Sequence, residues 1–318
     1  DSGESITEAS SGGTDAVAVV TTTDFVNMTA ASFNEIEEIR FAGANQTGTF
    51  TGAQLTGETL SLTETASGTS NLIINVASGT TATFANITAS TFTSGSDTIT
   101  INGTTGNETI TGPNVASTIN GGTGDDSITG GSAADIISGE NGNDTIDGGD
   151  GADSLTGGSG NDVYLFDTGD VDSGESITEA SSGGTDAVAI VTTTDFANMT
   201  AASFNEIEEI RFAGANQTGT FTGAQLTGET LSLTETASGT SNLIINVASG
   251  TTATFANMTA STFTSGSDTI TISGTTGNET ITGPNIASTI NAGTGDDIII
   301  GGTGNDIITG GIGDDTLT

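Results

Sequence analysis

The segment GGTGDDSITGGSAADIISGENGNDTIDGGDGADSLTGGSGNDVYL, residues 121–165, repeats one pattern every nine residues. Each unit starts with glycine, carries aspartate at its sixth position and has an apolar or aromatic residue at its eighth. Glycines permit the positive φ angles of tight turns, and a single apolar residue can point inward from a short strand. Two such units, 18 residues, therefore predict one coil of a flattened solenoid, with coils stacked roughly 4.8 Å apart.

The same nine-residue pattern runs through residues 103–165 and returns in residues 274–318. In the first array the inward eighth positions are Ile110, Ile119, Ile128, Ile137, Ile146, Leu155 and Tyr164. The first two units of each array depart from the pattern at position six. Glu108 and Glu279 are one methylene longer than aspartate, and Ser117 and Ser288 carry no charge.

A much longer repeat contains these arrays. The sequence that begins at Asp1 begins again at Asp172, 171 residues later. The two copies differ at 17 of their 147 shared positions. A two-copy duplication explains this similarity, but we favour a longer tandem array of which the chain is a piece.

The composition excludes several classes of function. Forty acidic residues face two basic ones, giving a formal charge of −38. This charge argues against nucleic-acid binding and against contact with anionic lipid, and no apolar run is long enough for direct membrane insertion. The chain has no histidine and no cysteine, so the usual catalytic triads, zinc proteases and thiol nucleophiles are absent and we expect no enzyme activity.

The arrays resemble the RTX family, the calcium-binding repeats of secreted bacterial proteins with consensus GGxGxDxUx. The resemblance implies a parallel β-roll that holds several Ca²⁺ ions between stacked turns, type I secretion, and an extracellular or cell-surface location. The metal ligands it implies are Asp126, Asp135, Asp144, Asp153, Asp162, Asp297, Asp306 and Asp315, with weaker Glu108 and Glu279. Backbone carbonyls of Gly121, Gly130, Gly139, Gly148, Gly157, Gly301 and Gly310 would add further oxygens.

Calcium prefers six or more oxygen ligands, which two turns 18 residues apart can share. The expected pairs are Asp126 with Asp144, Asp135 with Asp153, Asp144 with Asp162, Asp297 with Asp315 and, more weakly, Glu279 with Asp297. Asp306 faces Ser288 and lacks a second carboxylate. Metal-free turns rich in glycine and aspartate are the plainer alternative.

Upstream of each array, short segments rich in apolar residues recur at intervals of about 8 to 12 residues, as in EEIRFAG and NLIINVAS. We predict an all-β fold, a right-handed parallel β-solenoid that is wider in 16–102; a separate β-sandwich there is the alternative. Residues 30–41 suggest one helical turn before a strand. The predicted segments are solenoid 1–102, roll 103–165, acidic link 166–171, solenoid 172–273 and roll 274–318.

Three smaller features stay open. The junction 164–177 holds Asp167, Asp170, Asp172 and Glu175, either as a solvated loop or as a calcium-stiffened link. The half-motif GGTD places Asp15 and Asp186 near a possible cation. The second copy also carries Ile298, Ile300, Ile307 and Ile312, which we expect to form one exposed apolar patch that docks on another coil or chain.

Three functions compete at this point. The favoured one is a calcium-stabilised extracellular fibre, sheath or surface layer, built by self-association of identical repeats or chains. The second is the extender of a giant adhesin in a biofilm, whose ligand, such as a surface polysaccharide, binds outside this sequence. The remote third is ice binding through the threonine rows of GGTGDD and GGTGND, residues 121–126 and 301–306.

Overall fold

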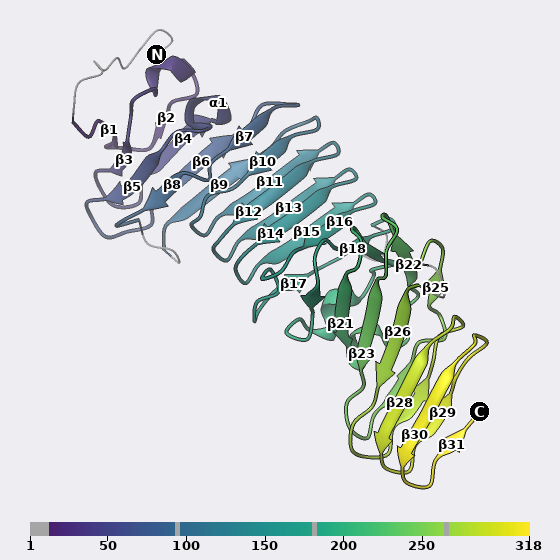
Figure 1. The fold of residues 1–318 in the computed structure, drawn as a ribbon. Coiled ribbons are helices and arrows are strands. Elements are labelled where there is room, and N and C mark those ends of the chain that lie inside the picture. Colours follow the sequence, from purple (N-terminus) through teal and green to yellow (C-terminus); the bar gives the residue numbers. More distant parts are fainter. Residues whose placement is uncertain (1–12, 93–95, 180–182, 264–266) are drawn as a thin grey trace. The chain divides into compact units, whose positions relative to one another are not determined.

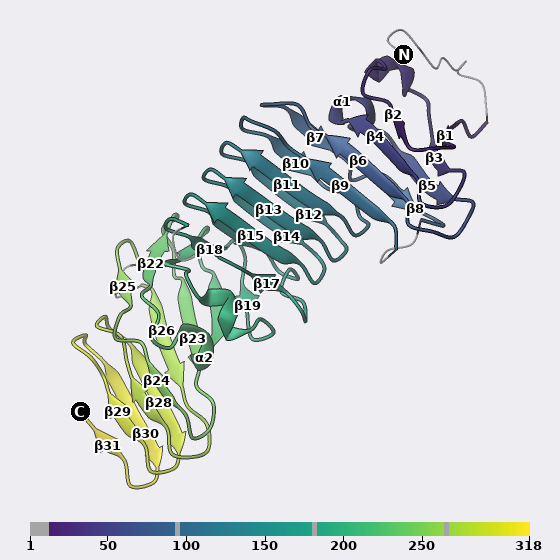
Figure 2. The ribbon, with the colours of Figure 1, turned by 180° about the vertical axis from the view of Figure 1, so that it is seen from behind.

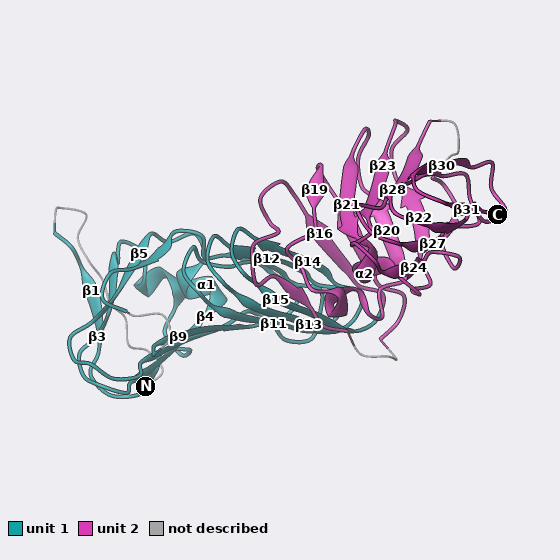
Figure 3. Cartoon of the chain, turned by 90° about the horizontal axis from the view of Figure 1, so that it is seen from below, with its two compact units in different colours: residues 1–160 teal, residues 161–318 magenta. Residues whose placement is uncertain are grey.

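The computed structural model describes residues 13–92, 96–179, 183–263 and 267–318. The chain forms two compact units, Asp1–Gly160 and Asn161–Thr318 (Figure 3). The sequence copies meet after residue 171, so the copy boundary lies inside the second unit. No helix in the described ranges is long and apolar enough to cross a membrane.

Parallel strands build the first unit, and consecutive strands along the chain mostly alternate between two sides of the stack (Figure 1). One side has the order β2 (Thr23–Asp24), β4 (Thr47–Thr51), β6 (Asn71–Asn75), β9 (Thr98–Asn102), β11 (Thr118–Thr123), β13 (Ile136–Asn141), β15 (Ser154–Ser159). The other has β1 (Ala16–Val19), β3 (Glu38–Phe41), β5 (Leu60–Glu64), β8 (Ile87–Ala89), and then β7 (Thr81–Thr83), β10 (Thr109–Thr111), β12 (Ser127–Gly131), β14 (Thr145–Gly149).

The second unit repeats this arrangement. One row is β19 (Thr194–Asp195), β21 (Thr218–Thr222), β23 (Asn242–Asn246), β26 (Thr269–Ser273), β28 (Thr289–Thr294), β30 (Ile307–Ile312). The others are β16 (Val163–Phe166), β18 (Ala187–Ile190), β20 (Glu209–Phe212), β22 (Ser232–Glu235), β25 (Thr259–Ala260), and β24 (Thr252–Thr254), β27 (Thr280–Thr282), β29 (Ile298–Ile300), β31 (Thr316–Leu317). The short β17 spans Ser176–Ile177.

Strand register separates two kinds of coil. In the nonapeptide arrays a residue pairs with the residue 18 positions later, as Thr118 does with Ile136. Upstream the step is longer, from Ala16 to Glu38 or from Asn71 to Thr98. We call the coils of residues 16–102 and 187–273 wide and those of 103–160 and 274–318 narrow. Because both kinds pair in parallel with the next coil, the predicted parallel β-solenoid is confirmed and the β-sandwich alternative is wrong.

The wide coils contain the few helices of the described chain. A 3₁₀ turn η1 (Ala30–Ser32) and a short helix α1 (Gly52–Leu55) lie at one edge of the first unit, and η2 (Ala201–Phe204) and α2 (Gly223–Leu226) match them in the second (Figure 2). The helical turn expected within 30–41 is therefore present, followed by β3. Gln54 fixes α1: its side-chain oxygen accepts the Thr51 N–H at 2.7 Å, and its side-chain nitrogen donates to the Phe25 carbonyl at 2.8 Å.

The core differs between the two kinds of coil. Every eighth-position residue of the first array is at most 1% exposed, so the predicted inward positions are confirmed. A narrow half-coil contributes little apolar volume beyond that residue. The wide coils instead pack phenylalanines, with the rings of Phe25 and Phe50 stacked at 4.7 Å and Phe33 edge-on to Phe50 at 5.5 Å. The wide coils consequently have the larger apolar core.

Candidate calcium sites

The sixth-position aspartates lie immediately before the strands and point into the turn, where water does not reach them. Asp126 is 2% exposed and Asp135 is 1% exposed. Others are equally buried: Asp144, Asp153, Asp162 and Asp297. Asp306 and Asp315, in the last coils of the second unit, are only half-buried. Buried carboxylates are costly unless their oxygens find donors or cations.

One oxygen of Asp126, Asp135, Asp144, Asp153 and Asp297 has a donor in the preceding coil. The backbone N–H of Glu108 donates to Asp126 Oδ1 at 2.6 Å, and that of Asp126 donates to Asp144 Oδ1 at 2.7 Å. Asp135 and Asp153 make the same contact on the opposite edge, at 2.7 Å. In the second unit the pairs Glu279 with Asp297, Ser288 with Asp306, and Asp297 with Asp315 repeat it. The structure thus brings together four of the five pairs that were expected from their 18-residue spacing.

The second oxygen is the one available to a cation. Asp126 Oδ2, Asp135 Oδ2 and Asp297 Oδ2 are buried and accept no hydrogen bond. A Cβ placed on Gly121 would lie 2.6 Å from Asp126 Oδ2 and 2.8 Å from the Gly139 carbonyl oxygen. A carboxylate of one coil and a carbonyl of the next therefore converge where glycine leaves room, which is the donor set that calcium prefers.

We call this space beside a glycine, between a carboxylate and a carbonyl, the cradle. The opposite edge of the coil has a second one. A Cβ on Gly130 would lie 2.3 Å from the Gly148 carbonyl and 2.8 Å from Asp135 Oδ2. The predicted carbonyl ligands with such contacts are Gly121, Gly130, Gly139, Gly148 and Gly301; those of Gly157 and Gly310 stay predictions. In the described residues no three acidic side chains cluster tightly enough to hold an ion by themselves. Each candidate site would therefore depend on backbone carbonyls as further ligands.

Burial sets the protonation of these carboxyls. Desolvation raises the pKa of Asp126 and of Asp135 to about 6, against the hydrogen bonds from Glu108 and Ser117 that lower it. The charge of Glu108 adds to the rise at Asp126. A divalent cation would offset both effects, because it favours the ionised form that burial disfavours.

A second ladder of side chains runs on the outside of the turns, in the opposite direction. Asn107 Oδ1 accepts the N–H of Asp125 at 3.0 Å, and Asp125 Oδ1 accepts that of Asn143 at 2.8 Å. Fifth-position side chains therefore reach forward to the next coil, whereas sixth-position side chains reach back. The nine-residue period identifies both positions, but it does not predict toward which neighbouring coil each side chain reaches.

In the first two units of the array, where the sixth residue is not aspartate, the sixth-position side chains have hydrogen-bond partners within the protein. Glu108 Oε1 accepts the Gly79 N–H at 2.6 Å and Oε2 accepts the Thr104 N–H at 3.0 Å. Ser117 donates its hydroxyl to Asp135 Oδ1 at 3.0 Å. Nothing in the sequence pattern signals the contact with Gly79, because the intervening wide coil has no fixed length. Calcium binding by Glu108 and Glu279 remains a proposal that these hydrogen bonds do not favour.

The second copy has a partly filled cradle. Ala292 stands where the first copy has Gly121, and its side chain is fully buried. By analogy with Gly121, its methyl group points at the space between Asp297 and the next coil. We therefore expect weaker calcium binding at Asp297 than at Asp126.

The second occurrence of the GGTD half-motif, residues 183–186, and the junction lie in the second unit. Asp186 is 1% exposed, accepts the Asp162 N–H at 2.8 Å, and its pKa is raised by desolvation to about 6. Its sequence equivalent Asp15 is half-buried, and Gly12 of the first GGTD lies outside the described residues. In the junction Asp170 and Glu175 are 8% and 2% exposed, so a fully solvated loop does not describe them. The expected pair of Asp144 and Asp162 spans the two units and stays a prediction.

The four isoleucines do not form one patch. Ile298 and Ile300 lie on β29, 47% and 42% exposed, whereas Ile307 and Ile312 lie on β30, which belongs to a different sheet. Units nine residues apart occupy opposite sides of the coil, so the prediction of a single patch is wrong. Sequence analysis also missed Ile136, 58% exposed, which is the first-copy equivalent of Ile307.

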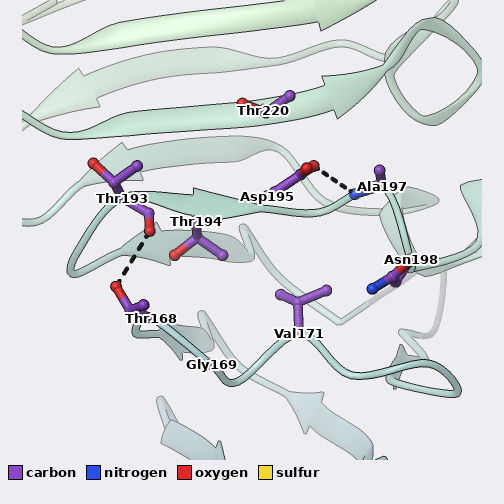
Figure 4. A pocket seen from close by; sticks show the side chains of 9 residues that line it. All are labelled: Thr168, Gly169, Val171, Thr193, Thr194, Asp195, Ala197, Asn198 and Thr220. Atoms are coloured by element: carbon purple, nitrogen blue, oxygen red, sulfur yellow. Dashed lines mark hydrogen bonds between the residues drawn. The ribbon is translucent and has the colours of Figure 1, made fainter.

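A shallow cavity of about 390 Å³ lies beside the junction (Figure 4). Its walls are mostly Thr, Asn and small residues: Thr168, Gly169, Val171, Thr193, Thr194, Asp195, Ala197, Asn198 and Thr220. Asp195 accepts the Ala197 N–H at 3.0 Å within its own turn. The lining shows no acid–base pair of the kind that catalysis uses.

Comparison with known proteins agrees with the ladder of carboxylates. The family model of the RTX calcium-binding nonapeptide repeat matches residues 102–137, 114–146, 138–170 and 287–317. No curated protein and no solved structure matches the chain. The matched residues contain the buried aspartates and the glycine cradles described above. The chain therefore carries RTX calcium-binding nonapeptide repeats in residues 102–170 and 287–317.

Proposed function

We propose that this chain is a calcium-stabilised extracellular structural protein whose repeats associate into a fibre, sheath or surface layer on a bacterium. RTX repeats are typical of secreted proteins, and calcium outside cells reaches the range that extracellular modules bind. The proposed role is non-catalytic. Any adhesive ligand or surface polysaccharide would bind through regions other than the repeats described here.

The observation that carries this proposal is the set of buried oxygens without a hydrogen bond, Asp126 Oδ2, Asp135 Oδ2 and Asp297 Oδ2. Ionised carboxylates in a thin core destabilise the fold unless a cation binds them. A cation that binds only the folded chain stabilises it by mass action. Folding of the narrow coils is therefore coupled to the calcium-rich side of the cell envelope.

Self-association is the finer part of the proposal. The exposed pair Ile298 and Ile300 replaces Ser127 and Thr129 of the first copy. Two adjacent isoleucines in an otherwise polar row of threonines, Thr280 and Thr282 before them and Thr316 after, favour contact with another coil or chain.

Electron microscopy and circular dichroism of the same samples, with millimolar calcium and after chelation, test this function. Filaments or sheets that dissolve as the β signal falls are the expected result. Isolated rods that soften on chelation would favour the adhesin extender instead. An Asp126→Asn, Asp144→Asn variant serves as the control, because it keeps the shape of both side chains but removes the charges that the cation needs. An unchanged β signal in the wild-type chain after chelation would overturn the proposal.

A further inference from the structure

Buried polar groups are satisfied differently in the wide and the narrow coils. In the described parts of residues 13–108 and 183–279, no fully buried side-chain nitrogen or oxygen lacks a hydrogen-bond partner. The narrow coils contain Asp126 Oδ2, Asp135 Oδ2 and Asp297 Oδ2, which accept none. Unsatisfied buried groups cost folding free energy, so a cation is needed in the narrow coils rather than in the wide coils.

Buried amides show how the wide coils satisfy themselves. Gln54 is 1% exposed, and it bonds the Thr51 N–H and the carbonyls of Phe25 and Met28. Gln225 repeats all of these bonds in the second copy. The first copy's arginine is also used internally, because Arg40 pairs with Glu38 two residues earlier. None of these contacts involves a group that calcium would complete.

The boundary between the two kinds of coil is closed by one glutamate in each copy. Glu108 is 1% exposed, and its two oxygens accept the N–H groups of Gly79 and Thr104. Glu279 bonds Gly250 and Thr275 in the same way, at 2.7 Å and 3.4 Å. The backbone N–H of Glu108 meanwhile donates to Asp126 Oδ1. The Glu108 side chain thus bonds backbone groups at the end of the wide coils, while its backbone N–H makes the first of the hydrogen bonds to sixth-position aspartates in the narrow coils.

We propose that the wide coils fold without calcium and that the calcium requirement starts after Glu108 and Glu279. The extra methylene of glutamate lets its carboxylate reach backbone donors of the wide coil, which takes the place of a cation at that turn. Each copy then alternates a segment whose stability does not depend on calcium with one whose stability does. This inference rests on the proposed function, since it takes the narrow coils to need calcium.

Hydrogen exchange of the full chain, read by mass spectrometry with calcium and after chelation, tests the proposal. We expect amides of β6 and β9 to keep their protection within about threefold, and amides of β12 and β13 to lose at least about tenfold. Loss of protection in both sets together would overturn the inference and leave the proposed function intact. No loss in either set would overturn both.

A pair of variants tests the glutamate closure. After chelation, Glu108→Ala should raise exchange of β9 and of the Gly79 turn by about tenfold, because two buried N–H groups lose their acceptor. Glu279→Ala is the matched control, since it should affect β26 and the Gly250 turn but leave the first copy unchanged. Calcium-loaded samples of both variants show whether the chain still folds. Unchanged exchange at β9 in chelated Glu108→Ala would overturn the role of Glu108.

Discussion

At the scale of single residues, the sixth-position aspartate has two oxygens with separate roles. Oδ1 of Asp126 holds the preceding coil through the Glu108 N–H, and Oδ2 lies at the cradle left by Gly121. The first role is filled by the protein alone, whereas the second is the one that we assign to calcium. In this proposal a single side chain links strand stacking to calcium concentration.

The cradle predicts that a methyl group at this position weakens calcium binding in either copy, so adding it to the first copy and removing it from the second should have opposite effects. Gly121 has no positive φ in the structure, so Gly121→Ala adds crowding near Asp126 Oδ2 without backbone strain. Crowding of about 1–3 kcal/mol would weaken calcium binding in the first copy by at least about fivefold. Ala292→Gly should strengthen binding in the second copy. Calcium titrations followed by circular dichroism measure both midpoints, and equal midpoints in all three proteins would contradict the assignment of the cradle.

The raised pKa values predict how stability changes with pH when calcium is removed. Asp126, Asp135 and Asp186 have pKa values of about 6 in the fold, against an ordinary value of 3.8. Between these values the folded chain binds more protons than the unfolded chain, so stability falls as pH rises from about 4 to about 7. Metal-free protein should unfold at a higher urea concentration at pH 5 than at pH 7.5.

General repulsion among surface acids acts in the same direction, so this experiment needs a control. Asp126→Asn with Asp135→Asn removes two of the buried titrating groups and should flatten the pH dependence. Asp125→Asn removes an exposed acid of the same array and should leave the slope nearly unchanged. A urea midpoint that rises with pH in the metal-free wild-type chain would refute the prediction.

At the scale of elements, the coil was predictable in its narrow form and less so in its wide form. The nine-residue beat places Ile119 and Ile137 inward and sets their register, because one apolar residue per half-coil leaves no alternative pairing. The wide coils have no fixed length, so the contact of Glu108 with Gly79, 29 residues away, was beyond the pattern. The same nine-residue step also places Ile300 and Ile307 on different sheets, although we had predicted that they lie in one patch.

The wide coil makes a prediction about its helical insert. Gln54→Ala leaves the Thr51 N–H and the carbonyls of Phe25 and Met28 without their partner, which should cost about 3 kcal/mol. Because no cation takes part, we expect the loss to be the same with calcium and with chelator. Thermal unfolding monitored by phenylalanine absorbance in both conditions measures it. Gln54→Glu is the matched control, since it keeps the acceptor for Thr51 but loses the donor; a loss seen only in chelator would contradict the prediction.

At the scale of the whole molecule, repetition sets the number of coils, and the exposed apolar residues form the proposed contact surface. The copies share nearly all of their wide-coil sequence, and their differences gather in residues 121–147. These differences place Ile298 and Ile300 on the surface of the second copy. The parallel solenoid and the buried aspartates were predictable because they repeat, whereas what the surface contacts depends on single substitutions that do not repeat.

Assembly is the property that tests this surface. Ile298→Ser with Ile300→Thr restores the first-copy residues and should reduce assembly in calcium by at least about tenfold in critical concentration, if two isoleucines bury their apolar area at the contact. Ile136→Ser, on a sheet of the first unit, is the matched control and should have little effect. Sedimentation of calcium-loaded samples measures assembly, and identical sedimentation of the double variant and wild type would exclude this surface.

The half-coil of nine residues has a consequence for how such arrays change over time. Adding or deleting 18 residues restores every later strand of that roll to its original side, because Thr118 and Ile136 are in phase. Adding or deleting nine residues turns every later coil of the roll by half a revolution and exchanges the faces that it displays. A gene that gains or loses a single nine-residue repeat thus changes the length of the array and also the side on which its later surface residues lie.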